Sequence, residues 1–140
     1  MKKLTWLLLA LFCAVTFAQD KIVFNPNTSK GKLYQYASFV NVEDNTLSIE
    51  DVVASKNLDF KPIPSDNLSL GFTSSNYWVS FSLENTSSSK NTYYLETARP
   101  VTDLANLYIL NKGSVTKYQS GDQIPFNKRQ VAHRSTVFKL

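Results

Sequence analysis

The stretch LSLGFTSSNYWVSFSLEN, residues 68–85, decides the fold of this 140-residue chain. From residue 77 onward the apolar side chains occupy every second position, at Tyr77, Val79, Phe81 and Leu83. Successive side chains of a strand point to opposite faces, so this alternation predicts a half-buried β-strand. A shorter strand is expected at residues 68–70, and the Gly, Ser and Asn residues between the two predict a polar turn.

Trp78 breaks the alternation, because it lies on the face that otherwise carries only Ser and Glu. Two interpretations are open. A large aromatic side chain on a polar face can be an exposed platform for a ligand, or it can close the edge of a core or contact a second layer. We favour the second interpretation and keep Trp78 as a ligand-binding candidate.

Short strand-like segments recur at roughly ten-residue spacing along the rest of the chain. They cover residues 33–42, 92–97, 104–110, 115–119 and 134–140. Residues 111–113 predict a hairpin turn, and the strand before that turn is apolar on both faces, which predicts a central, doubly buried position. The pattern as a whole is typical of an all-β fold, either a β-sandwich or a jelly roll.

One short helix is expected near residues 48–55. Ser48 precedes Asp51 by three positions, and a Ser followed three residues later by an acid is the pattern of a helix capping box. The apolar residues that follow are too few for more than one or two turns.

The first 18 residues have the composition of a secretory signal peptide. Two lysines precede an apolar run, and Thr16 and Ala18 provide small residues for cleavage before Gln19. An uncleaved anchor and lipid attachment at Cys13 are the alternatives. We expect an exported protein, periplasmic or extracellular, with a linker at residues 19–32 and one β domain at residues 33–140.

Composition excludes several classes of function. The 15 basic residues, less the two in the signal peptide, leave 13 against 11 acidic residues, and without a basic stripe this predicts no binding to nucleic acid. Cys13 is the only cysteine and His133 the only histidine, which argues against disulfides and against zinc held by several histidines. No G-x-S-x-G motif is present. We therefore expect no enzymatic activity, no metal and no cofactor; residues 43–45 could hold calcium, but a solvated turn is the simpler interpretation.

The chain ends at Leu140 on an apolar strand position, with no turn or polar tail after it. Native domains avoid an unpaired hydrophobic edge of this kind. We therefore expect the β domain to be incomplete at its C-terminal end, with an open sheet edge through which the chain could associate with itself.

Three ordered blocks of sequence resemble one known domain. They are L-x-L-G with Y-W-V-x-F-x-L-x-N (residues 68–85), Y-L-E with a proline and D-L-x-x-L-Y (residues 94–108), and S-G-D-x-x-P-F-x-x-R-x-x-x-H-R-x-x-x-F-x-L (residues 120–140). Together they resemble the 7TMR-DISM extracellular 2 domain, the sensor domain of bacterial seven-transmembrane receptors with diverse intracellular signalling modules. The resemblance covers residues 39–140.

This resemblance implies an exported jelly-roll domain similar to carbohydrate-binding modules. In full-length relatives it would be followed by a seven-helix membrane region and a kinase, cyclase or other output domain. This chain has no stretch of transmembrane length after the signal peptide. It would therefore correspond to the sensor part of a membrane receptor.

Binding is the function that the sequence favours. Sugars are commonly bound by aromatic faces and by planar polar groups that contact their hydroxyls. The candidates for such contacts are Trp78, Tyr94, Arg99, Arg129, His133 and Arg134. We predict a ligand-sensing domain for a carbohydrate or a related small molecule. The alternatives are that most of these aromatics are core residues, and that the domain is a protein-interaction or assembly module without a small-molecule ligand.

Overall fold

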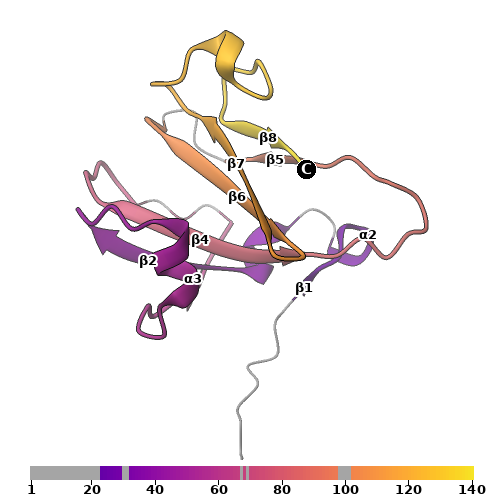
Figure 1. Ribbon diagram of the computed structural model, residues 1–140, viewed down its shortest axis with the longest axis horizontal. Coiled ribbons are helices and arrows are strands. Elements are labelled where there is room, and N and C mark those ends of the chain that lie inside the picture. The colour runs from indigo at the N-terminus through magenta and orange to yellow at the C-terminus, as the bar shows by residue number, and fades with distance from the viewer. Residues whose placement is uncertain (1–22, 30–31, 67, 69, 98–101) are drawn as a thin grey trace, which may run out of the picture.

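The computed structural model describes residues 23–29, 32–66, 68, 70–97 and 102–140. Most of the elements in this part of the chain are β-strands (Figure 1). The elements are β1 (Val23–Phe24), α2 (Pro26–Ser29), the 3-10 helix η1 (Leu33–Tyr36), β2 (Ala37–Glu43), α3 (Ile49–Ala54), β3 (Lys61–Pro62), β4 (Asn76–Leu83), β5 (Tyr94–Glu96), β6 (Ala105–Asn111), β7 (Ser114–Ser120), the 3-10 helix η2 (Phe126–Lys128) and β8 (Val137–Lys139).

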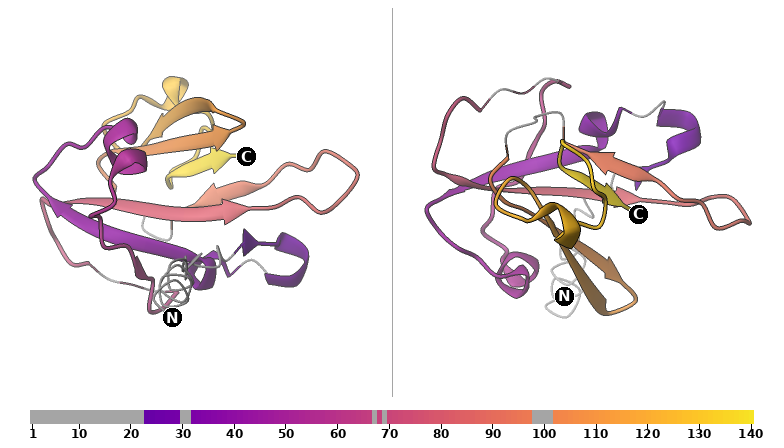
Figure 2. Two further views of the ribbon diagram at one scale, coloured as in Figure 1. Left: turned by 60° about the horizontal axis from the view of Figure 1, so that its bottom comes forward. Right: turned by 90° about the horizontal axis from the view of Figure 1, so that it is seen from above.

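The strands form two layers. One is a four-stranded sheet with the order β1-β4-β2-β3, and the β6-β7 hairpin and the β5-β8 pair lie to one side of its β2 and β4 strands (Figure 2). The fold is all-β and consistent with a sandwich, as the sequence predicted. The jelly-roll topology implied by the resemblance stays a prediction.

The central pair of the four-stranded sheet is β2 and β4, which run antiparallel. Phe39 pairs with Val79 and Val40 pairs with Trp78, and paired residues point to the same face. Successive side chains of β4 therefore point to opposite faces of the sheet, as the sequence predicted. Burial does not follow it: Val79 on the apolar face is 53% exposed, whereas Trp78 on the other face is half-buried. The reason is that the β6-β7 hairpin covers the face that carries Trp78.

The strand predicted at residues 104–110 is present, but its predicted central and doubly buried position is wrong. This segment forms β6, which pairs only with β7 in a two-stranded sheet, and its Leu110 is 52% exposed. The strand that is buried on both faces is β8, where Val137 and Phe138 are both buried. An apolar run cannot distinguish a central strand from one half of a hairpin, because that choice depends on pairing far along the chain.

Two local predictions are confirmed. The helix α3 begins after Ser48, whose Oγ accepts a hydrogen bond from the Asp51 N–H at 3.1 Å, while a carboxylate oxygen of Asp51 accepts from the Ser48 N–H at 3.0 Å. This is the expected capping box. The predicted hairpin turn lies between β6 and β7, where Lys112 and Gly113 have φ values of 46° and 82°. Positive φ at both central residues matches the twist of the flanking strands.

Other segments differ from expectation. Leu68 and Leu70 are not in a strand, and residue 69 lies outside the described residues. The interval 19–32, expected to be a linker, contributes α2 and β1, and β1 pairs parallel with β4. Phe24 of β1 is buried and meets the Tyr36 ring edge-on at 5.5 Å. The signal peptide predicted at residues 1–18 lies outside the described residues and stays a prediction.

A side chain closes part of the outer edge of β8. On its inner edge β8 is hydrogen-bonded to β5. On its outer edge the Gln130 Nε2 donates to the Lys139 carbonyl at 3.0 Å, and the Gln130 Oε1 accepts from the Lys139 N–H at 2.8 Å. The amide of Gln130 thus makes the two hydrogen bonds that a neighbouring strand would make at this position.

Candidate ligand-binding site

Trp78 forms a contact between the two layers. Its ring stacks on that of Tyr108 from β6, with the centroids 5.5 Å apart and the planes inclined by 26°. The Lys117 Nζ of β7 lies 5.5 Å from the centre of the Tyr108 ring. This geometry favours the interpretation in which Trp78 contacts a second layer, because one of its faces is already occupied.

Arg129 and His133 lie together in the loop between β7 and β8. The Arg129 Nε donates to the Ile124 carbonyl at 2.8 Å, and its Nη1 donates to the His133 carbonyl at 3.1 Å. Its guanidinium lies 4.5 Å from the centre of the Phe126 ring. The imidazole Nδ1 of His133 accepts from the Ser135 N–H at 3.1 Å. Arg129 therefore uses its Nε and Nη1 groups to stabilise the conformation of the loop.

The remaining candidates from the sequence are dispersed. Tyr94 is 63% exposed on β5, where it pairs with Lys139, and Arg134 is exposed in the β7-β8 loop. Arg99 lies outside the described residues. None of the five described candidates lines either of the two surface hollows described below.

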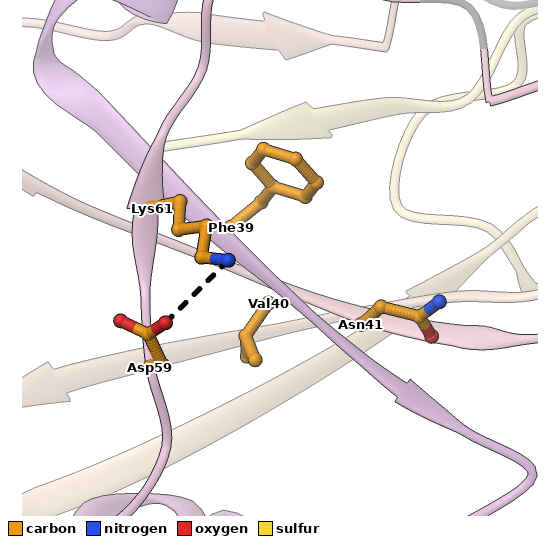
Figure 3. Close-up of a pocket in the computed structure, with 5 residues that line it drawn as sticks. All are labelled: Phe39, Val40, Asn41, Asp59 and Lys61. Atoms are coloured by element: carbon orange, nitrogen blue, oxygen red, sulfur yellow. Dashed lines mark ion pairs between the residues drawn. The ribbon is translucent and has the colours of Figure 1, made fainter.

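One of these hollows lies at the edge of the four-stranded sheet, where β3 separates from β2. Lys61 pairs with Phe39, but the chain before Lys61 diverges and leaves the Val40–Asn41 edge of β2 without a paired strand. The resulting space has a volume of about 350 Å³ and is lined by Phe39, Val40, Asn41, Asp59 and Lys61 (Figure 3). We call it the β2-β3 hollow.

The lining of the β2-β3 hollow combines apolar and charged groups. The Lys61 Nζ is 3.5 Å from the Asp59 carboxylate, and both side chains are exposed. The Asn41 Oδ1 accepts from the Glu43 N–H at 2.8 Å, which fixes the orientation of its amide at the bulge between Asn41 and Glu43. Beside these polar groups lies the half-buried ring of Phe39. The hollow therefore offers an apolar ring together with a carboxylate, an ammonium and an amide.

Comparison with known protein families gives one match. The 7TMR-DISM extracellular 2 family matches residues 34–140, which is more than half of the chain. The chain belongs to this family. No curated protein and no solved structure matched the chain. This 7TMR-DISM extracellular 2 domain is thus a sensor domain of membrane receptors, and its location is exported and periplasmic.

Two properties of the described residues of the 7TMR-DISM domain bear on its site. None of its described helices is long and apolar enough to cross a membrane. Within the same residues no group of three or more His, Cys, Asp or Glu side chains could hold a metal ion. Residues 43–45, considered above for calcium, form a turn in which both the Asn45 N–H and its Nδ2 donate to the Val42 carbonyl.

Sequence reasoning did not find the residues of the β2-β3 hollow. Phe39 and Asn41 are part of a strand-like pattern, and Asp59 and Lys61 lie in a proline-containing connection with no motif of their own. They meet because β3 pairs with β2 over only two residues. The alternation of Asp59, Phe60 and Lys61 before Pro62 was the one available signal, since it is compatible with a short edge strand.

Proposed function

We propose that this 7TMR-DISM extracellular 2 domain senses a carbohydrate or a related polar small molecule, and that the β2-β3 hollow binds it. The observation that carries the proposal is that the Phe39 ring, the Asp59–Lys61 ion pair and Asn41 line the same hollow. An aromatic face packs against the apolar side of a sugar ring, and the three polar groups can donate to and accept from its hydroxyls.

The dimensions of the hollow agree with this proposal. A volume of about 350 Å³ lies at the lower end of the range of small-molecule sites, roughly 300 to 1,000 Å³. The ion pair is exposed, so it contributes little to stability, and its two members can exchange partners for ligand hydroxyls at small cost. A small saccharide therefore fits the site better than a long polymer.

A glycan array with the purified exported domain is the first test. The affinity of each saccharide that binds is then measured by calorimetry for the unsubstituted domain and for the variants Asp59→Asn and Lys61→Gln. We expect each substitution to weaken binding by about tenfold or more, because a hydrogen bond to a charged group is worth roughly 1.5 to 3 kcal/mol. The matched control is Lys90→Gln, an exposed lysine in the loop after β4.

The same assay tests the residues named from the sequence. The ligand-binding role of these residues stays a prediction, and substitutions show whether they contact the same ligand. The residues are Trp78, Tyr94, Arg99, Arg129, His133 and Arg134. An array without any hit, combined with capture of a protein partner, would favour the protein-interaction module instead. Saccharide binding that Asp59→Asn and Lys61→Gln leave unchanged would contradict the assignment to the β2-β3 hollow.

A further inference from the structure

A second hollow lies on a different part of the surface, between α3 and the tip of the β6-β7 hairpin. Its volume is about 410 Å³. The apolar part of its lining comes from Ile49 and Val53 of α3, Leu110 of β6 and Val115 of β7. We call it the α3-hairpin groove.

The groove gathers apolar side chains that are unusually open to solvent. Val53 is 62% exposed, Leu110 52% and Val115 49%. A single exposed apolar side chain needs no explanation, but three that line one hollow form a concave apolar surface of the kind that binds ligands.

Both walls of the groove are held in shape by local hydrogen bonds. The capping box of Ser48 and Asp51 fixes the start of α3. On the opposite wall the Ser114 Oγ donates to the Asn111 carbonyl at 2.7 Å and closes the tip of the hairpin, where Gly113 adopts positive φ. The groove is therefore formed before any ligand arrives, which lowers the entropic cost of binding.

Two opposite charges complete the lining. Glu50 of α3 and Lys112 of the hairpin turn both line the groove, on opposite walls. The only ion pair among the described residues joins Asp59 and Lys61, so Glu50 and Lys112 pair neither with each other nor with another described side chain. The groove thus presents an apolar surface, one free carboxylate and one free ammonium.

We propose that the α3-hairpin groove binds a free apolar α-amino acid. Lys112 would pair with the ligand carboxylate, Glu50 with the ligand ammonium, and the apolar side chain would lie against Val53, Leu110 and Val115. A ligand with only one charge would satisfy one wall and be repelled by the other. An apolar zwitterion is the ligand chemistry that matches all three features, and it is distinct from the polar ligand proposed for the β2-β3 hollow.

The test is an NMR titration of the full exported domain with L-leucine. We expect the amide signals of Val53, Leu110, Lys112 and Val115 to shift in a saturable way. Glycine lacks the apolar body, leucinamide lacks the carboxylate and N-acetylleucine lacks the ammonium. Leucinamide and N-acetylleucine should bind more weakly than leucine by up to about fivefold, the size of effect that an exposed ion pair can reach. Glycine should also bind more weakly, because it buries no apolar side chain in the groove.

Substitutions separate the two charges. Lys112→Gln should weaken leucine binding about fivefold but strengthen leucinamide binding slightly, because the repulsion between Lys112 and the ligand ammonium is removed. Glu50→Gln should likewise weaken leucine binding and slightly strengthen the binding of N-acetylleucine, whose carboxylate Glu50 repels. Lys90→Gln is the matched control and should change neither. The positions are exposed, so folding is preserved, and the dispersion of the amide spectrum checks this directly.

Three results would overturn the proposal. They are the absence of saturable shifts at the groove, equal binding of leucine and leucinamide, and shifts at the same amides that follow protein concentration in the absence of leucine. The last result would assign the groove to contacts between copies of the chain. None of these outcomes bears on saccharide binding, because Asp59 and Lys61 do not line this groove.

Discussion

At the scale of single residues, Trp78 carries the contact between the two layers. We expect Trp78→Ala to destabilise the domain by about 2 kcal/mol, less than the roughly 3 to 5 kcal/mol of a fully buried Trp, because the side chain is half-buried. In a double-mutant cycle of Trp78→Ala and Tyr108→Ala, the coupling energy should be about 0.5 to 1.5 kcal/mol, the value of a stacked aromatic pair. Denaturant unfolding followed by circular dichroism measures both. An unchanged midpoint together with lost ligand binding would instead make Trp78 a ligand platform.

Gly121 is the glycine whose replacement should matter most. Its φ is +111°, and a Cβ there would lie 2.6 Å from the Asp103 carbonyl oxygen and 2.7 Å from that of Thr102. These two oxygens accept hydrogen bonds from the Gln123 and Asp122 N–H groups. We expect Gly121→Ala to cost about 3 kcal/mol, from backbone strain and from displaced backbone together.

The control for this substitution is Gly113→Ala in the hairpin turn. Gly113 also has positive φ, +82°, but nothing lies within 4 Å of the position of its Cβ. Only the strain of a left-handed backbone should appear there, about 1 to 2 kcal/mol. Equal melting temperatures of the two variants would show that close packing at Gly121 contributes nothing.

At the scale of the elements, the stability of the N-terminal capping box of α3 depends on pH. Hydrogen bonds from the Ser48 side chain and backbone N–H lower the pKa of Asp51 below its usual value. A lowered pKa in the folded state means that the capping box stabilises the domain above the unfolded pKa, roughly 3.9, and that this contribution is lost as the pH falls through the lower folded value. Ser48→Ala should therefore raise the pKa of Asp51. An NMR titration of the Asp51 carboxyl in both proteins checks this, and identical values would contradict it.

The elements also show what the sequence can and cannot predict. The capping box at Ser48 and the turn at Lys112–Gly113 were predictable, because each depends on residues three or four positions apart. The pairing of β1 with β4 and the position of β6 at the side of the sheet were not, because both depend on partners far along the chain. The β2-β3 hollow was missed for the same reason, since its lining requires β3 to leave β2 after two residues.

At the scale of the whole molecule, the folded unit extends beyond the residues that match the family. The match begins at residue 34, yet Phe24 is buried against Tyr36, and its carbonyl accepts from the Glu84 N–H at 3.1 Å. We expect Phe24→Ala to destabilise the domain by about 3 kcal/mol. Val23→Ala, at an exposed position of the same strand, should change stability by less than about 0.5 kcal/mol. Similar unfolding midpoints for the two variants would show that β1 is dispensable.

The predicted signal-peptide cleavage site lies before β1. We expect the exported chain to begin at Gln19, because Thr16 and Ala18 fit the small pockets of signal peptidase. Cleavage there leaves β1 attached to the domain. Mass spectrometry of the exported protein gives its first residue; a start at Met1, or a lipid on Cys13, would contradict this prediction.

The Gln130 amide beside β8 has a consequence for association between molecules. Exposed strand edges recruit strands from other chains, and this recruitment is the first step of many aggregation processes. By occupying both backbone groups of Lys139, Gln130 removes one rung of the ladder that an incoming strand would need. We therefore expect this neutral side chain to hinder the addition of a strand at Lys139 without adding a charge to the surface.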